Sequence, residues 1–174
     1  MFRDRRWYGA QIDLKNATIW LKDGGVGSAQ QSLEVKIGEG TLTYDERRNI
    51  DYVRDRGRLD TVKEGDEEPI DVRFDFTWEF LQAVSTSAAG TPTVEDALKQ
   101  RGEAAWWTSS SSDVCEPYAV DIEVNYAPPC GTELDENIVL PDFRYTSLAH
   151  DLSAGTVAVT GQCNVTDALI TRTV

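Results

Sequence analysis

The sequence has few residues of the kinds that build reactive or nucleic-acid-binding sites. Its 174 residues include one His, three Cys and one Met, and only 17 Lys and Arg against 30 Asp and Glu. The shortage of basic residues disfavours a surface that grips nucleic acid, because phosphate binding normally requires a patch of Lys and Arg. No apolar run is long enough for a signal peptide or a membrane span. We therefore expect the chain to stay in the compartment that makes it, without a membrane partner.

Motifs for catalysis and for cofactors are also missing. His150 is the single histidine, and the chain contains no G-x-S-x-G segment that would mark a nucleophile. The glycines of DGGVG (23–27) lack the Lys and Ser/Thr of a phosphate-binding loop. We interpret these glycines as a turn between strands and His150 as a turn residue. The sequence predicts a protein that is not an enzyme and needs no cofactor; a small acidic β-barrel hydrolase would need a cleft with converging carboxylates.

The three cysteines, Cys115, Cys130 and Cys163, allow three interpretations. Together with His150 they have the ligand types of a zinc site, although structural zinc sites usually contain a C-x-x-C pair and this chain has none. Buried free thiols are the second interpretation. A disulfide is the third, and the odd number of cysteines would leave one thiol for a bond between subunits.

The charge that is present is mostly negative and unevenly spread. The formal net charge is −13. Residues 103–174 contain 2 of the 17 basic residues and 11 of the 30 acidic ones. We therefore expect the C-terminal part to present an acidic face.

Alternation of apolar and polar residues is the strongest structural signal, because successive side chains of a strand point to opposite faces of a sheet. In residues 69–80 one face would carry Ile70, Val72, Phe74, Phe76, Trp78 and Phe80. Residues 118–126 repeat the pattern. Further strands are predicted at residues 17–22, 33–37, 42–44, 136–148 and 155–170, with a bend at Gly38 and Gly40. Pro141 cannot donate to a ladder and should lie at an edge or a bulge.

One segment, TPTVEDALKQRG (91–102), has the features of a helix. Thr93 can cap the N-terminus, and Gly102 supplies the stop. Val94, Ala97, Leu98 and Arg101 recur at helical spacing, so they should form the stripe that lies against a sheet. Six to eight strands and one short helix predict a mainly β domain spanning residues 1–174, either a β-sandwich or an open barrel with a flanking helix.

Two segments are too polar to be core. Residues 108–113, TSSSSD, should form a flexible surface loop. Residues 47–69 carry 6 basic and 7 acidic side chains in 23 positions, which fits either a solvated loop or an ordered arm that docks on another subunit. The apolar residues within this segment favour the arm, because a solvated loop has little use for them. Candidate contact residues of the arm are Tyr52, Val53, Arg54, Arg56, Arg58, Leu59, Asp60 and Glu64.

The order of these phrases resembles one family. RRNIDYVRDRGRLDTVKEGDEEPIDVRFDFTWEFL (47–81), then TPTVEDALKQRG, CEPYAVDIEVNY and ENIVLPDFRYTSLAHDLSAGTVAVTGQCNV, are similar to tail tube proteins of tailed bacteriophages. The resemblance implies a structural protein of the virion tail that assembles in the host cytoplasm. Six copies would form a ring in which hairpins join into an inner β-barrel, and rings would stack into a tube that conducts genome DNA during ejection.

The resemblance also implies partners. These are further copies in stacked homohexameric rings, a tape-measure protein, a tail terminator and, in a contractile tail, a sheath. DNA would pass the lumen without specific binding, repelled by acidic residues for which the candidates are Asp71, Asp75, Asp121 and Glu123. Two alternatives stay open: a head-to-tail connector or tail terminator ring, and a tube subunit of a related contractile secretion or bacteriocin system.

Overall fold

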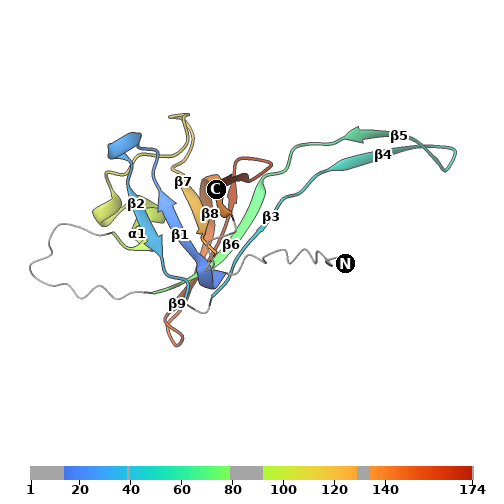
Figure 1. Cartoon of the computed structure of the whole chain (residues 1–174). Coiled ribbons are helices and arrows are strands. Elements are labelled where there is room, and N and C mark those ends of the chain that lie inside the picture. The colour runs from blue at the N-terminus through green and yellow to red at the C-terminus, as the bar shows by residue number, and fades with distance from the viewer. Residues whose placement is uncertain (1–13, 39, 79–91, 129–133, 174) are drawn as a thin grey trace, which may run out of the picture.

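The computed structural model describes residues 14–38, 40–78, 92–128 and 134–173. Within these ranges the chain is mainly β, with one short α-helix (Figure 1). The strands are β1 (Ala17–Lys22), β2 (Ser32–Val35), β3 (Leu42–Asp45), β4 (Ile50–Asp55), β5 (Arg58–Glu64), β6 (Ile70–Thr77), β7 (Val120–Tyr126), β8 (Asp135–Asp151), β9 (Thr156–Cys163) and β10 (Leu169–Thr173). The helix is α1 (Val94–Lys99), and the single 3₁₀ turns are η1 (Leu14–Asn16), η2 (Gly27–Ala29) and η3 (Gly102–Ala104).

Eight strands form one antiparallel sheet in the order β2-β1-β7-β8-β9-β6-β3, and β10 pairs with the first part of β8. The sheet curls back on itself. The chain that leaves β2 returns to β6, where the Thr77 N–H donates to the carbonyl of Lys36 at 2.9 Å and the Asp75 N–H donates to that of Thr41 at 3.2 Å. This nearly closed sheet confirms the predicted open-barrel class.

The alternating segments form strands with the predicted faces. In β6, Ile70, Val72, Phe74 and Phe76 are buried, and in β7 every second residue from Val120 to Tyr126 is buried. The rings of Phe74 and Phe143 pack with centroids 5.9 Å apart at the centre of this core.

The prediction for Trp78 is wrong, because β6 ends at Thr77 and Trp78 is 40% exposed. The backbone N–H of Trp78 donates to the carbonyl of Gly155. The rings of Trp78 and His150 pack edge to face with their centroids 5.2 Å apart. The alternating pattern continues beyond Thr77, the last residue of β6 that pairs with β9, so the pattern predicts a strand longer than the one that forms. Phe80 lies outside the described residues.

Strand β8 contains two residues whose positions were predicted from the sequence, Pro141 and His150. Pro141 lies in the middle of the sheet at a bulge, where the pairing with β7 shifts between Val120 and Ile122, and not at an edge. The next residue, Asp142, has a positive φ of 54°. His150 is a strand residue paired with Val157, so its interpretation as a turn residue is wrong. Strand β8 continues to Asp151 because β9 pairs with it from Phe143 to Asp151.

Helix α1 begins as predicted and ends earlier. The hydroxyl of Thr93 accepts a hydrogen bond from the Asp96 N–H at 3.1 Å, and Ala97 and Leu98 are buried. The helix stops at Gln100, whose left-handed φ of 51° closes the last turn before Gly102. Arg101 therefore lies beyond the helix and outside the buried stripe.

Candidate assembly interface

Residues 47–69 contain a two-stranded ribbon that projects from the body, here called the arm and defined as β4, β5 and their turn (Figure 1). Strands β4 and β5 pair from Ile50↔Glu64 to Asp55↔Arg58, with a bulge in the ladder next to Val53 and Arg54. Arg56 and Gly57 form the turn with φ values of 48° and 81°, the two positive values that tight hairpins favour. The arm is thus an ordered hairpin and not a structureless loop.

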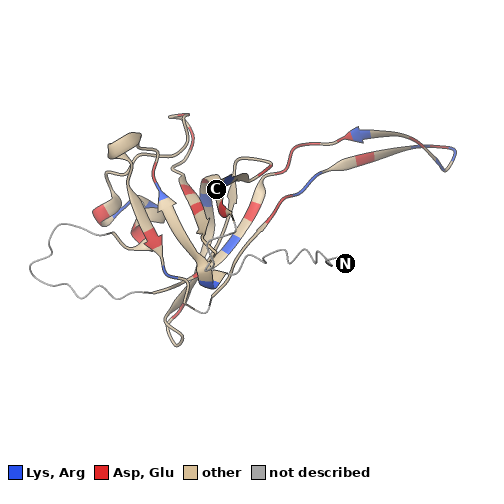
Figure 2. Cartoon of the chain, in the orientation of Figure 1, with Lys and Arg blue, Asp and Glu red and all other residues tan. Residues whose placement is uncertain are grey.

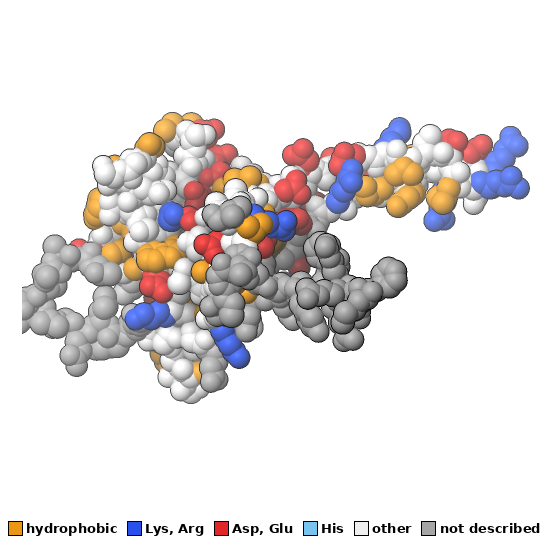
Figure 3. All heavy atoms as spheres, viewed as in Figure 1, with side chains coloured by type: hydrophobic (Ala, Val, Ile, Leu, Met, Phe, Trp, Pro, Cys, Tyr) orange, Lys and Arg blue, Asp and Glu red, His pale blue; other side chains and the backbone are white. Residues whose placement is uncertain are grey.

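The two faces of the arm differ in chemistry. Because paired residues share a face, Tyr52 and Val62 lie together. Ile50 lies on the same face two residues toward the body, and Leu59, paired with Arg54, lies toward the tip. Tyr52, Leu59 and Val62 are 60%, 68% and 61% exposed. Figure 3 shows hydrophobic side chains gathered on one side of the arm. This apolar face packs against nothing else in the described part of the chain.

The tip of the arm is basic. Arg54, Arg56 and Arg58 lie within five residues that contain one acid, Asp55, and Figure 2 shows this end of the arm in blue. None of the three arginines forms a salt bridge within the described residues.

The root of the arm is acidic and hollowed. A groove of about 400 Å³ is lined by Glu46, Arg47, Arg48, Asn49, Glu64, Gly65, Asp66, Glu67, Glu68, Thr166 and Asp167. Both arginines of the groove form salt bridges: Arg47 with Asp71 at 2.8 Å and Arg48 with Glu64 at 3.0 Å. The groove therefore keeps a surplus of negative charge, and we call it the root groove.

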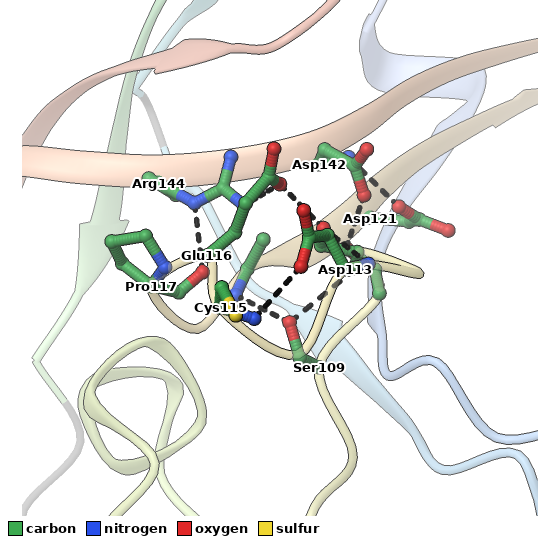
Figure 4. Close-up of polar contacts among 11 residues, drawn as sticks. Ser109, Asp113, Cys115, Glu116, Pro117, Asp121, Asp142 and Arg144 are labelled. Atoms are coloured by element: carbon green, nitrogen blue, oxygen red, sulfur yellow. Dashed lines mark hydrogen bonds and ion pairs between the residues drawn. The ribbon is translucent and has the colours of Figure 1, made fainter.

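A second polar cluster joins the loop before β7 to the bulge of β8 (Figure 4). Ser110 donates its hydroxyl proton to Asp142 at 2.9 Å, and the Asp142 N–H donates to Asp121 at 3.0 Å. Arg144 donates to the carbonyl of Pro117 at 2.9 Å and pairs with Glu116 at 2.8 Å. Residues 108–113 form a surface loop, as predicted, and the Ser110 hydroxyl ties this loop to Asp142 of the sheet. In the sequence, the Pro141–Asp142 pair inside a predicted strand is the feature that could have indicated this cluster, because Pro and Asp favour turns.

Partial burial is the largest influence on the pKa of Asp121 in this cluster. It raises the pKa of Asp121 above its ordinary value, although the Asp142 N–H and the Ser110 hydroxyl act in the opposite direction. Burial also raises the pKa of the nearby Cys163 thiol to about 12. The cluster thus ties the loop before β7 to β8 through hydrogen bonds to the carboxylates of Asp121 and Asp142 and through the Arg144–Glu116 salt bridge.

Three of the four acids expected to face a lumen are already engaged. Asp71 pairs with Arg47 and accepts from Gln162, while Glu123 pairs with Lys22 and accepts from Asn137. Asp121 belongs to the buried cluster just described. Asp75, which lies close to Gly40, forms no side-chain hydrogen bond or salt bridge within the described residues.

The two described cysteines and His150 do not form a cluster. Cys115 is an exposed free thiol and Cys163 a buried one, while Cys130 lies outside the described residues. Cys163 pairs with Phe143 and His150 with Val157, which places them at opposite ends of β9. His150 instead lies 3.4 Å from Glu95. Within the described ranges no group of three metal-ligating side chains occurs, and no helix there is long and apolar enough to cross a membrane.

Comparison with solved structures reveals similar chains in contractile injection systems. The PVC sheath/tube terminator of an extracellular contractile injection system matches with a TM-score of 0.54 and 12% identity, covering 94% of this chain and 99% of that one. A chain of the PVC sheath–tube complex matches with 0.51 and 11%, covering 95% of each chain. The tube-terminating cap of the anti-feeding prophage matches with 0.52 and 12%, covering 94% and 93%. The chain has their fold. No protein-family model and no curated protein sequence matches it.

Proposed function

We propose that this protein is a structural, non-catalytic subunit of a contractile, phage-tail-like tube, and that it forms the ring that ends the tube as a terminator or cap. The observation that carries the proposal is the end-to-end match with a sheath/tube terminator, which covers 94% of this chain and 99% of that chain. The match with a tube-terminating cap supports the same position. Sheath and tube proteins would then be its partners.

The arm supports assembly independently of these similarities. A two-stranded hairpin is marginally stable by itself in water, and this one exposes its apolar face. Burying a side chain such as Val62 contributes about 1.5–3 kcal/mol. Contact with another copy supplies that burial, so we propose that the arm is the element that joins neighbouring subunits.

A tube subunit is the second candidate function. The match with a chain of a sheath–tube complex favours it. In this case hexameric rings would stack, with a tape-measure protein and a terminator as further partners. The net charge of −13 would suit a lumen that conducts DNA without adhesion.

Electron microscopy of the purified protein, with mass measurement in solution, tests both candidates. A terminator or cap forms single rings that bind the end of a tube. A tube subunit polymerises by itself into filaments of stacked rings. A protein that remains monomeric at all concentrations, with and without tube and sheath proteins, would exclude both functions.

A further inference from the structure

Two surfaces of this chain are complementary to each other and yet cannot meet within one copy. The first is the arm, with its basic tip and its apolar face. The second is the root groove with the strand beside it. Each arm strand has six or seven residues, so tip and root lie about 20 Å apart along a paired ribbon. The ribbon cannot fold back on its own root without breaking its ladder.

The charges of the two surfaces are opposite in sign. Arg54, Arg56 and Arg58 at the tip have no salt-bridge partner among the described residues. In the root groove the consecutive acids Asp66, Glu67 and Glu68 likewise have none there, because Arg47 and Arg48 pair with other carboxylates. Cations without a salt bridge on one surface and acids without one on the other are the pattern of an interface that steers and orients two partners.

Apolar groups lie beside the charges on both surfaces. At the root, Ala168 donates its N–H to Glu46 at the groove wall, and the next two residues, Leu169 and Ile170, are 59% and 46% exposed. They belong to β10, an edge strand whose five residues are all exposed. On the arm, Tyr52 and Val62 adjoin the basic tip on the apolar face. Each surface thus combines exposed apolar groups with a charged patch.

We propose that the arm of one copy docks on the root groove and β10 of a second copy, with the arginine tip against the acidic groove and the apolar face against the exposed edge strand β10. The proposal rests on the proposed self-assembling function and names the surface that receives the arm. The contact is heterologous, because each copy offers its arm to one neighbour and its root groove to another. Repetition of such a contact closes into a ring when the rotation between copies closes.

Charge exchange between two variants tests the contact. The tip variant carries Arg54→Glu, Arg56→Glu and Arg58→Glu, and the root variant carries Asp66→Lys, Glu67→Lys and Glu68→Lys. Each variant alone should lose assembly in sedimentation velocity, because like charges now face each other. An equimolar mixture should recover the wild-type profile, since every tip then meets a groove of opposite sign. The control, Glu34→Lys with Glu103→Lys, changes exposed acids elsewhere and should assemble normally.

The possible outcomes distinguish a failure of the docking contact from a failure of the proposed assembly function. A wild-type protein that never assembles overturns the proposed function. Wild-type assembly together with assembly of either variant alone, or with a mixture that stays unassembled, overturns the docking contact and leaves the function standing. Circular dichroism establishes that all variants fold.

Cross-linking with a nearly native chain gives a second measurement. Arg56→Lys keeps the positive charge and provides an amine that a carbodiimide couples to a carboxylate. In assembled protein made from equal parts of isotopically light and heavy chains, we expect mixed-label peptides joining residue 56 to residues 66–68. Cross-links from residue 56 to other segments only would refute the contact.

Discussion

Phe76 and Asp75 are neighbours in β6 whose side chains face opposite ways. Phe76 is buried in the core, whereas Asp75 lies on the outer face without a side-chain partner among the described residues. Phe76→Ala should lower the free energy of unfolding by about 3–5 kcal/mol, because it removes a large buried side chain and leaves a cavity. Asp75→Asn should change it far less. Chemical denaturation measures both, and equal losses would contradict the register of β6.

Asp121 should make stability depend on pH. Burial raises its pKa in the folded protein above the unfolded value, so the folded state binds its proton more tightly. Its contribution to stability is therefore greatest at low pH and is lost as the pH rises from the unfolded pKa through the folded one. Asp121→Asn keeps an oxygen for the Asp142 N–H without the buried charge. We expect the variant to gain stability relative to wild type at pH 7 and to lose this advantage near pH 3.

Denaturation curves at the two pH values, with Asp113→Asn as the matched exposed control, measure this difference. A variant that is less stable than wild type at pH 7 would show that the hydrogen bonds of the ionised carboxylate outweigh its burial. The loop of residues 108–117 would then depend on the charge itself.

At the scale of elements, the arm offers a comparison between its two faces. Tyr52→Ser with Val62→Ser removes the cross-strand apolar pair, and Asp51→Ser with Lys63→Ser alters the neighbouring rung on the opposite face. The first double variant should lose assembly, because the face that another copy would bury becomes polar. The second should assemble like wild type. Sedimentation velocity distinguishes them, and similar behaviour of the two would remove the apolar face from the interface.

The elements also show how far local pattern determines structure. Strands β6 and β7 and the Thr93 cap were predictable because alternation and capping depend on residues adjacent in the chain. The attachment of residues 108–113 to the sheet was not, since it depends on Asp142, about thirty residues away. The polar side chains of this run can form hydrogen bonds equally well with water or with the sheet, so the sequence alone does not distinguish the two.

At the scale of the whole molecule, the acidic side chains outside the root groove repel DNA only if they face a conduit. Of the four lumen candidates, Asp75 is the one without a side-chain partner among the described residues, because the others are paired or partly buried. If rings conduct DNA past Asp75, Asp75→Lys should leave assembly intact and make DNA adhere at low salt, with release as salt rises. Glu103→Lys is the control of equal charge. Filter binding on assembled protein measures adhesion, and equal adhesion of both variants would reduce the −13 to a matter of solubility.

The sequence by itself determined the mainly β class, the two-faced strands and the single capped helix, because these follow from the spacing of apolar residues along the chain. It also marked residues 47–69 as a segment with more apolar groups than a solvated loop needs. Only the tertiary structure decided that this segment is a hairpin with one apolar face and that Trp78 and His150 meet outside the core. It also decided that acids without a salt bridge among the described residues gather in a groove beside β10. Those features depend on which strands pair across the sheet, and pairing between distant segments is set by the packing of the whole chain and not by local periodicity.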